Sequence, residues 1–251
     1  MKNPIKLLPI FAMLLLPCLL HSQSDTPEKP KDADIRILNC CDTDQAERWR
    51  TGLDLKFKNQ YIGRDIRIAQ RGPVGKISFV GKDTIEVFRT EDANRAIARI
   101  PASLKAGGFY TILVLGNLGA STSDVEIKLI EEFPMPENEL QPDMVRMQLV
   151  NAVKNYPVAL KIRSGSTNSS PEYSELQKYF FAPGELEMDL VYRQDSGKVV
   201  SVPWLIETAR GDDYVAVIHP SKHRSNTPTF MRINVAASRN QILNLQKNEE
   251  D

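Results

Sequence analysis

The sequence predicts an all-β protein of two tandem, small antiparallel β-sandwich domains with few short helices, and three observations lead to this class. Most apolar runs alternate with polar residues at a period of two, which is typical of strands with one solvated face. Clusters of Gly, Pro, Asn and Asp separate these runs at regular spacing. The order of the runs in residues 34–133 then recurs in residues 144–240.

The alternation is clearest in "LDLKFK", where Leu53, Leu55 and Phe57 fall on one face and charged residues fall on the other. The same pattern occurs in "VEIKLI" (125–130), "VRMQLV" (145–150) and "VALKI" (158–162). By contrast, "YTILVLG" (110–116) and "YVAVI" (214–218) are apolar on both faces. We expect these two runs to be central strands.

The repeat is visible in "GGFYTILVLGN" (107–117) and "GDDYVAVIHPS" (211–221), each of which is a turn, an aromatic residue and an apolar run. A unit of about a hundred residues fits a complete small domain better than a solenoid repeat. We therefore predict a duplicated domain, with chance similarity of two strand-rich halves as the alternative. The matched residues would be Arg36 with Arg146, Asn39 with Asn151, Gly75 with Gly184, and Arg89 with Arg193.

Residues 1–24 have the order of a secretory signal peptide: Lys2 and Lys6, then an apolar stretch, then small polar residues. We expect cleavage near Ser22 or Ser24 and a periplasmic or secreted location. The alternative is a lipoprotein modified at Cys18, although the preceding residue is a proline rather than a small residue.

The remaining segments follow from composition. Residues 25–33 predict a disordered lead-in, residues 134–143 a stiff Pro-rich linker, and residues 241–251 a charged C-terminal tail. Because each half has its own alternating strands, we expect the halves to fold independently. Short helices are expected in "DQAERWR" (44–50), "SPEYSELQKYF" (170–180) and "SRNQILNLQ" (238–246).

Charge and cysteine content argue against a nucleic-acid-binding protein and against a scaffold held together by disulfides. The 32 basic residues equal the 32 acidic ones, so no bulk positive charge is present to hold nucleic acid. Beyond the expected signal peptide only Cys40 and Cys41 remain, and they are adjacent. A disulfide between neighbours would be strained, and the favoured interpretation is one cysteine packed inward as a small hydrophobic residue.

A search for catalytic residues finds no convincing site. His219 and His223 form an H-x-x-x-H pattern in a Pro- and Ser-rich stretch, where a polar surface loop is expected rather than a metal site. The serines of "RSGSTNSS" (163–170) lack a nucleophile elbow. The acidic pairs at 131–132 and 212–213 are expected to be solvated turn residues. We predict no catalytic residue, cofactor or metal site.

Aromatic residues offer one alternative to a purely structural role, because sugar rings stack on aromatic faces. Most of these side chains are expected to fill the core or the junction between the halves, and a carbohydrate platform is the alternative. The candidates are Trp49, Tyr61, Tyr156, Tyr173, Tyr179, Phe180, Phe181 and Trp204.

Several short motifs together resemble the AlgF family of alginate O-acetylation. These are a signal peptide, the "IRILNCC" strand, Gly-containing turns into "PVGKISF" and "FAPGELEMDL", then "GGFYTILVLGN", and "VRMQLVNA" after the acidic Pro-rich link. The chain departs from the family in its two adjacent cysteines and in "YIGRDIRIAQRG". We expect this segment to be a loop of the first domain that is longer than the family's. Each half is also similar to secreted bacterial β-sandwich modules of unassigned function.

The resemblance implies a non-catalytic periplasmic adaptor that works with membrane or periplasmic acetyltransferases to decorate an exopolysaccharide such as alginate. No family residue with a catalytic role maps onto this chain. The alternative is a secreted carbohydrate- or envelope-binding module without catalytic activity, and an enzyme is the third class. Expected partners are therefore periplasmic or membrane proteins and a polysaccharide, but not nucleic acid.

Overall fold

The structure is a computed structural model. It describes residues 31–43, 51–70, 74–119, 124–133, 143–154, 157–163, 167–194, 196–221 and 228–234. The expected signal peptide, charged tail, nearly all of the linker and most of the lead-in lie outside these residues. Ala33, which we expected in the lead-in, is instead the fully buried first residue of strand β1.

Among the described residues, the first half forms eight strands in two four-stranded sheets. The outer sheet has the order β3-β2-β5-β6, and the inner sheet has the order β4-β1-β7-β8. The strands are β1 (Ala33–Asn39), β2 (Gly52–Phe57), β3 (Gln60–Arg67), β4 (Gly75–Ile77), β5 (Gly81–Arg89), β6 (Asp92–Leu104), β7 (Phe109–Asn117) and β8 (Asp124–Phe133).

The second half repeats this architecture strand for strand, with an outer sheet β11-β10-β13-β14 and an inner sheet β12-β9-β15-β16. The strands are β9 (Val145–Asn151), β10 (Val158–Ile162), β11 (Thr167–Ser169), β12 (Leu176–Phe181), β13 (Gly184–Arg193), β14 (Val199–Thr208), β15 (Asp213–Pro220) and β16 (Pro228–Asn234). The equal strand orders agree with a duplicated all-β unit.

The inner sheets are mixed rather than purely antiparallel, which corrects the predicted class in one detail. Strand β1 pairs with β7 in parallel, and β9 pairs with β15 in parallel. In each half the chain first returns to the inner sheet as an antiparallel edge strand, β4 or β12. After two more strands of the outer sheet it returns again as the parallel strand β7 or β15. Period-two alternation shows only that a segment is a strand, so it could not reveal this direction.

Two of the proposed matches between the halves hold and two do not. Asn39 and Asn151 end equivalent strands β1 and β9, and Arg89 and Arg193 end equivalent strands β5 and β13. Arg36 and Arg146 lie three and five residues before their asparagines, so they differ in register. The counterpart of Gly184 is Gly81 rather than Gly75, because both begin the equivalent strands and both have positive φ.

The helix expected around Pro171 is absent, because Leu176–Phe181 forms strand β12, which pairs with β9 along its whole length. Aromatic residues favour strands, and here the pairing outweighs the helix-start signal. The segment "YIGRDIR" is strand β3 rather than a loop. The helices expected at 44–50 and 238–246 lie outside the described residues.

Each half has a core between its two sheets. Leu53, Leu55 and Phe57 lie in the first core, as the alternation predicted, and Ile127 joins them from β8. The second core contains the predicted apolar residues of β9 and β10, which are Val145, Met147, Leu149, Val158, Leu160 and Ile162. Strands β7 and β15 are central in their sheets, as predicted.

A third core joins the two halves. It contains residues of β1, β7 and β8 together with residues of β9 and β15, so the inner sheet of each half packs against that of the other. Its buried members are Leu38, Cys40, Leu113, Leu115, Ile130, Val150, Ala152, Val215 and Val217. The face of "VRMQLV" that we expected to be solvated is therefore buried along its whole length.

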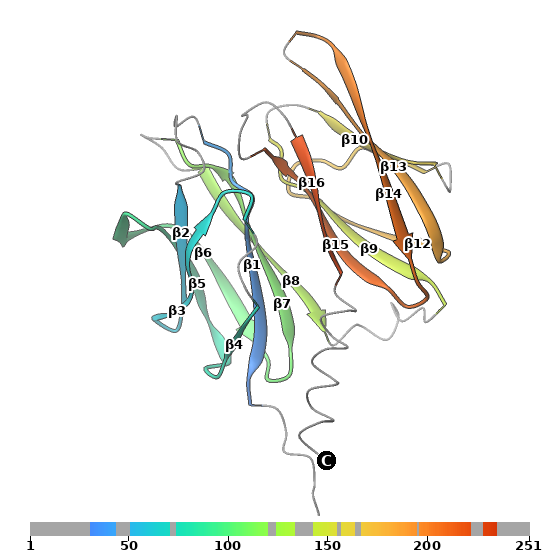
Figure 1. Cartoon of the computed structure of the whole chain (residues 1–251). Helices are drawn as coiled ribbons and strands as arrows, with labels where there is room; N and C mark the ends of the chain where they lie inside the picture. Colours follow the sequence, from blue (N-terminus) through green and yellow to red (C-terminus); the bar gives the residue numbers. More distant parts are fainter. Residues whose placement is uncertain are drawn as a thin grey trace, which may run out of the picture.

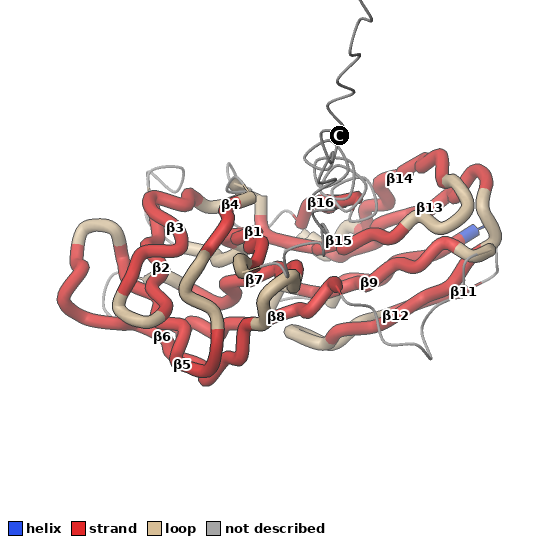
Figure 2. Tube along the Cα trace, turned by 90° about the horizontal axis from the view of Figure 1, so that it is seen from below, coloured by secondary structure: helices blue, strands red, loops and turns tan. Residues whose placement is uncertain are grey.

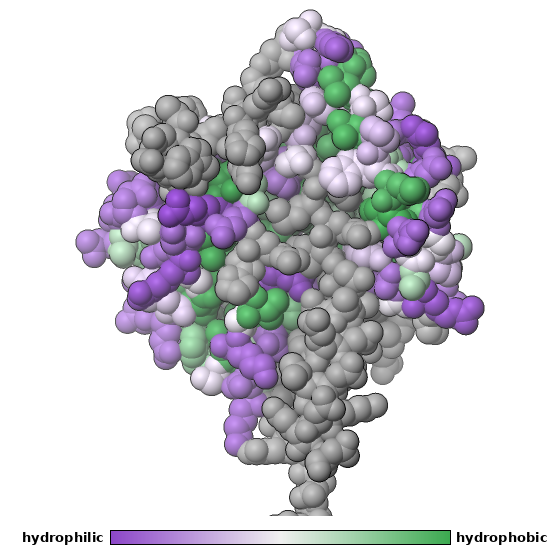
Figure 3. Space-filling view, viewed as in Figure 1, coloured by the Kyte–Doolittle hydropathy of each residue, from purple (hydrophilic) through white to green (hydrophobic). Residues whose placement is uncertain are grey.

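Figures 1 and 2 show the two halves side by side. Strands β1, β7, β8, β9 and β15 lie in the middle, and the outer sheets lie at the two ends (Figure 1). On the face seen in Figure 3, hydrophobic residues form small groups among hydrophilic ones at both ends of the molecule. The inner sheets thus bury apolar surface against each other, whereas the outer sheets lie at the ends of the molecule with one face toward solvent.

Candidate functional site

His219 is not the loop residue that we expected. It lies in strand β15, is only 3% exposed, and its Nδ1 donates a hydrogen bond to the carbonyl oxygen of Pro220 at 2.9 Å. Burial lowers the pKa of His219 from its ordinary value, while the hydrogen bond opposes this shift. An imidazole in this position is neutral and cannot reach a substrate, so the interpretation as a surface loop was wrong. His223 lies outside the described residues.

The two cysteines are free thiols on opposite faces of the first inner sheet. Cys40 belongs to the third core and Cys41 to the first, and both are buried. Burial raises the pKa of Cys40 to about 12 and that of Cys41 well above its usual value. A thiol that stays protonated is a poor nucleophile and metal ligand. Both cysteines therefore act as small hydrophobic residues, where we had expected only one to do so.

The acidic pairs correct the prediction of solvated turn residues in part, because Glu131 is exposed and Asp212 lies in a turn but their neighbours are buried. Glu131 and Glu132 lie in strand β8, and Glu132 is only 2% exposed. Asp213 is the first residue of β15 and is 5% exposed, whereas Asp212 lies in the preceding turn. In each pair the second carboxylate is buried, and it has an arginine as its partner.

Arg146 and Asp213 form the ion pair of the second half. They are direct neighbours in the parallel pairing of β9 with β15. The guanidinium approaches the carboxylate through two nitrogens, with Nε donating to Oδ1 at 2.9 Å and Nη2 donating to Oδ2. This two-point geometry satisfies both carboxylate oxygens, which a buried charge requires.

Arg36 and Glu132 form the looser ion pair of the first half. Arg36 Nη1 lies 3.8 Å from Glu132 Oε1, and its guanidinium carbon lies 4.9 Å from the centre of the Phe109 ring. The hydroxyl of Thr111 donates a hydrogen bond to the same Oε1. Among the described residues, the other oxygen of Glu132, Oε2, is buried without a hydrogen-bond partner.

The two ion pairs belong to one buried polar cluster between the halves, which we call the junction cluster: Arg36, Thr111, Glu132, Arg146 and Asp213. Burial raises the pKa of Glu132 to about 7, Arg36 and Thr111 lower it, Asp213 raises it and Arg146 lowers it. The charges of the second half therefore act on Glu132 of the first. The cluster continues the third core, because Arg36 and Glu132 lie two residues from Leu38 and Ile130 on the same strands.

One feature of the sequence indicates the junction cluster. Arginine occurs once in each of the apolar strands "IRILN" and "VRMQLV", and the neighbouring strands "YTILVLG" and "YVAVI" are apolar on both faces. A sheet that is covered on both faces must bury such an arginine, and a buried arginine needs a carboxylate. Which carboxylate it meets depends on strand order, which the sequence does not show.

A shallow recess opens at the seam between the halves. Lys154 pairs with Asp124 across the seam, and its ammonium lies 5.6 Å from the centre of the Tyr173 ring. Ser174 donates a hydrogen bond to Glu126, again across the seam. These contacts close the edge of the interface. The recess is lined by Asp42, Gly116, Asn117, Ala152, Val153, Lys154 and Pro220.

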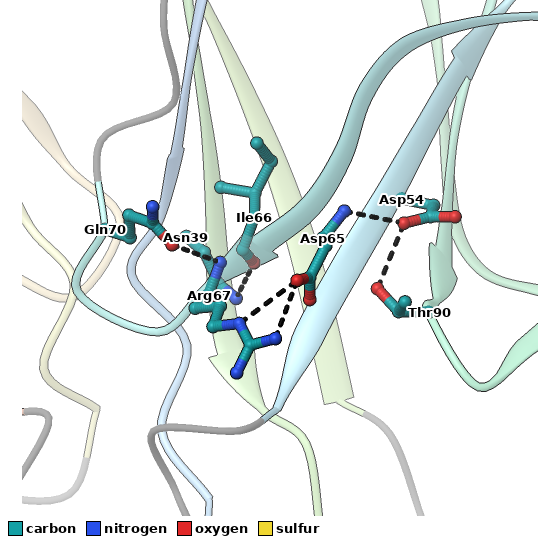
Figure 4. Close-up of polar contacts among 7 residues, drawn as sticks. All are labelled: Asn39, Asp54, Asp65, Ile66, Arg67, Gln70 and Thr90. Carbon is teal, nitrogen blue, oxygen red and sulfur yellow. Dashed lines mark hydrogen bonds and ion pairs between the residues drawn. The ribbon is translucent and has the colours of Figure 1, made fainter.

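A second polar network lies in the outer sheet of the first half (Figure 4). The Asp54 carboxylate accepts hydrogen bonds from the backbone N–H of Asp65 at 2.8 Å and from the Thr90 hydroxyl at 3.0 Å. Asp65 has a φ of 47° and accepts two hydrogen bonds from Arg67. A Cβ on Gly52 would lie 2.3 Å from Asp65 Oδ1. The network fixes the irregular pairing of β2 with β3, and Asp54 Oδ1 and Asp65 Oδ2 each accept two hydrogen bonds within it.

The aromatic candidates that the structure describes do not gather into one platform. Tyr179 and Phe181 stack on each other, with their ring centres 6.0 Å apart, and pack against the second core, as does Trp204. Tyr173 packs against the third core, and Tyr61 lies on the outer sheet of the first half. Phe180, on β12, is partly exposed. Trp49 and Tyr156 lie outside the described residues.

In the part of the chain that the structure describes, no group of three or more His, Cys, Asp or Glu residues is placed to hold a metal ion. The described residues also contain no helix that is long and apolar enough to cross a membrane. The serine-rich segment 164–166 lies outside the described residues.

No protein-family model and no curated protein matches this chain. Among solved structures it is similar to the Bacillus anthracis TIE protein, with a TM-score of 0.23 and 8% identity over 75% of this chain and 34% of that one. A leucine-rich repeat protein from Bacteroides thetaiotaomicron gives a TM-score of 0.18 and 8% identity over 79% of this chain and 26% of that one. The chain thus spans about a third of the first protein and a quarter of the second. Similarities this weak indicate neither a fold nor a function for this chain.

Proposed function

We propose that this protein is an exported, non-catalytic adaptor whose two β-sandwiches form one rigid body that binds protein partners. The observation that supports this proposal is the third core. Buried apolar residues of both inner sheets, such as Leu115 and Val217, form one cluster, and the junction cluster extends it. A contact of this kind holds the two halves in a fixed relative position.

Rigid placement of two modules favours recognition by several contacts at once. A binding surface that is already ordered loses less conformational entropy when a partner binds. The outer sheets lie at opposite ends of the molecule, so each can contact a different partner (Figure 1). The reactive groups that we considered, Cys40, Cys41 and His219, are buried and serve packing.

The class of partner rests on the sequence resemblance to the AlgF family. It suggests periplasmic or membrane acetyltransferases that act on an exopolysaccharide, and export follows from the signal-peptide pattern of residues 1–24. N-terminal sequencing of the exported protein tests the export step, with Gln23 or Asp25 as the expected first residue. A lipid-modified Cys18 would contradict cleavage at these sites.

The adaptor role can be tested by deleting the gene in its own host and measuring the O-acetyl content of the exopolysaccharide. We expect acetylation to be lost and to be restored by the wild-type gene. The variant Val217→Asp, which disrupts the third core, should not restore it, whereas Val199→Asp, at a valine that is 56% exposed, should. Unchanged acetylation in the deletion strain would exclude this pathway. Acetyl-transfer or esterase activity of the purified protein would exclude a non-catalytic role.

A second candidate function, binding of an anionic carbohydrate, is favoured by a group of cations on the outer sheet of the first half. Lys56 Nζ lies 4.8 Å and 4.5 Å from the ring centres of Tyr61 and Phe88. The guanidinium carbon of Arg64 lies 3.7 Å from the centre of the Tyr61 ring. Aromatic rings hold these cations in place without neutralising them, which leaves their charge available to a carboxylated sugar.

Binding of the purified protein to carboxylated and neutral glycans on an array would test this candidate. We expect binding only to carboxylated glycans, weakening as the salt concentration rises. The double variant Lys56→Ala/Arg64→Ala should lose it, and Lys161→Ala, at an exposed lysine of the other outer sheet, should keep it. Equal binding by both variants would exclude this surface.

A further inference from the structure

Glu132 differs from Asp213, the other carboxylate of the junction cluster, in how poorly its charge is compensated. The Asp213 carboxylate has a two-point contact with Arg146. Glu132 instead has an arginine nitrogen at 3.8 Å, a single hydroxyl donor, and one oxygen without a hydrogen-bond partner among the described residues. An ionised carboxylate in such a site is costly, because burial removes its hydration and little replaces it.

The side chains that act on Glu132 come from four strands, two in each half. Arg36 lies on β1 and Thr111 on β7 in the same half, and Arg146 and Asp213 lie on β9 and β15 in the other half. Arg146 is held by Asp213, and Arg36 also lies against the Phe109 ring. Neither arginine is therefore placed to satisfy both oxygens of Glu132.

We infer that Glu132 is a proton-controlled contact between the two halves, which closes the interface when its carboxyl group is protonated and weakens it when the group ionises. Protonation removes the carboxylate charge and leaves a carboxyl group that can donate a hydrogen bond, while Arg36 keeps its contact with the Phe109 ring. Ionisation places a charge near Asp213 of the opposite half, which repels it, and Arg146 offsets this repulsion only in part.

The direction of the pH dependence follows from burial. Burial raises the pKa of Glu132 from 4.5 to about 7, so the folded protein takes up this proton more readily than the unfolded chain does. The contribution of Glu132 to stability is therefore fully present below pH 4.5 and is lost as the pH rises through 7. The interface should respond within the neutral range, where an exported protein can meet changes in pH.

Carbon-detected NMR of the side-chain carboxyl groups tests the inference directly in the wild-type protein. We expect the signal of Glu132 to titrate near pH 7. The methyl signals of Val150, Val215 and Val217, in the other half, should shift with the same midpoint. Titration of Glu132 in the ordinary carboxylate range would overturn the inference. Methyl shifts confined to the first half would overturn its link between the halves.

The variant Glu132→Gln provides an independent test, because glutamine resembles the protonated side chain and cannot ionise. Its urea unfolding midpoint should equal that of the wild type at pH 5 and exceed it at pH 8. The matched variant Glu131→Gln should follow the wild type at both pH values apart from a constant offset. Titration of His219 affects all three proteins alike and cancels in the differences. A difference for Glu132→Gln that is the same at both pH values would contradict the inference, and if this variant does not fold, the NMR titration decides.

Discussion

At the scale of single residues, an asparagine at the end of the first strand of each half makes the same two types of hydrogen bond. Asn39 donates a hydrogen bond from its side chain to the Ile66 carbonyl oxygen at 2.8 Å and accepts one from the Cys41 N–H at 3.1 Å. Asn151 does the same with the Pro171 carbonyl oxygen at 3.0 Å and the Val153 N–H at 2.9 Å. Asparagine suits the end of a strand because its side chain can satisfy a backbone group two residues further on.

Replacing either asparagine by alanine should therefore destabilise the protein. Each substitution leaves a buried carbonyl and a buried N–H without their partner, which costs about 1–3 kcal/mol. Urea unfolding of Asn39→Ala and Asn151→Ala measures this loss. Asn94→Ala, at an exposed asparagine, serves as the control and should change stability by less than about 0.5 kcal/mol. A loss no larger than that of the control would show that these contacts contribute little.

Gly116 allows a second test at this scale. Its φ is 110°, and an added Cβ would lie 1.9 Å from the carbonyl oxygen of Asp124 on the neighbouring strand. Gly116→Ala should thus strain β7 against β8 and cost more than about 2 kcal/mol. Around Gly75, by contrast, a Cβ would meet nothing within 4 Å, so Gly75→Ala should be nearly neutral. Equal thermal unfolding midpoints for the two variants would contradict this expectation.

At the scale of strands, each of the two parallel strand pairs in the inner sheets contains a buried arginine. These are Arg36 on β1 and Arg146 on β9. Arg146 faces Asp213 because β9 and β15 run in parallel in this register. Removing one partner of such a pair leaves a buried, uncompensated charge, whereas removing both leaves an apolar contact.

The single variant Arg146→Met should therefore cost about 3–5 kcal/mol of unfolding free energy. The double variant Arg146→Met/Asp213→Leu should recover most of that loss, because both charges are then gone. Chemical unfolding of the wild type, both single variants and the double variant gives the coupling energy. Additive losses would mean that the two side chains do not act as a pair.

His219 on strand β15 should make the protein sensitive to acid. Burial lowers the pKa of His219 below its ordinary value of 6.5, so its contribution to stability is fully present above pH 6.5 and is lost as the pH falls through the folded-state pKa. Glutamine cannot be protonated in this range, and it can still donate to the Pro220 carbonyl oxygen. We expect the stability of His219→Gln, relative to the wild type, to rise as the pH is lowered from 7 to 5, measured by urea unfolding. A constant difference across this range would show that His219 does not titrate there.

At the scale of the whole molecule, the third core couples halves that the sequence suggests would fold independently. Each half has its own core, which supports separate folding, but each also buries the outward face of its inner sheet against the other. Separation of the halves would expose that apolar surface to water.

A charge introduced into the third core should consequently affect both halves. Val217→Asp places a carboxylate among apolar residues of β1, β7 and β8, whereas Val199→Asp changes only an exposed position. Hydrogen exchange measured by mass spectrometry should show faster exchange in β7 and β8 as well as in β15 for Val217→Asp, and no such change for Val199→Asp. Faster exchange confined to the second half would show that the halves are not coupled.

The sequence alone determined the all-β class and many members of the two sandwich cores. Period-two alternation reports directly which residues share a face, and Leu53, Leu55 and Phe57 lie where it placed them. The apolar runs of β7 and β15 likewise indicated central strands. These features depend on local pattern, which is present in the order of the residues.

Only the tertiary structure decided the parallel pairings, the third core and the junction cluster. Arg36 and Glu132 are almost a hundred residues apart, and no local pattern shows that β1, β7 and β8 bring them together. Adjacent acidic residues such as Glu131 and Glu132 have similar chemistry, but they point to opposite faces of a strand. Whether the second face is solvated or covered depends on the other half, so the burial of Glu132, and with it the pKa of about 7, is set by how the two halves pack.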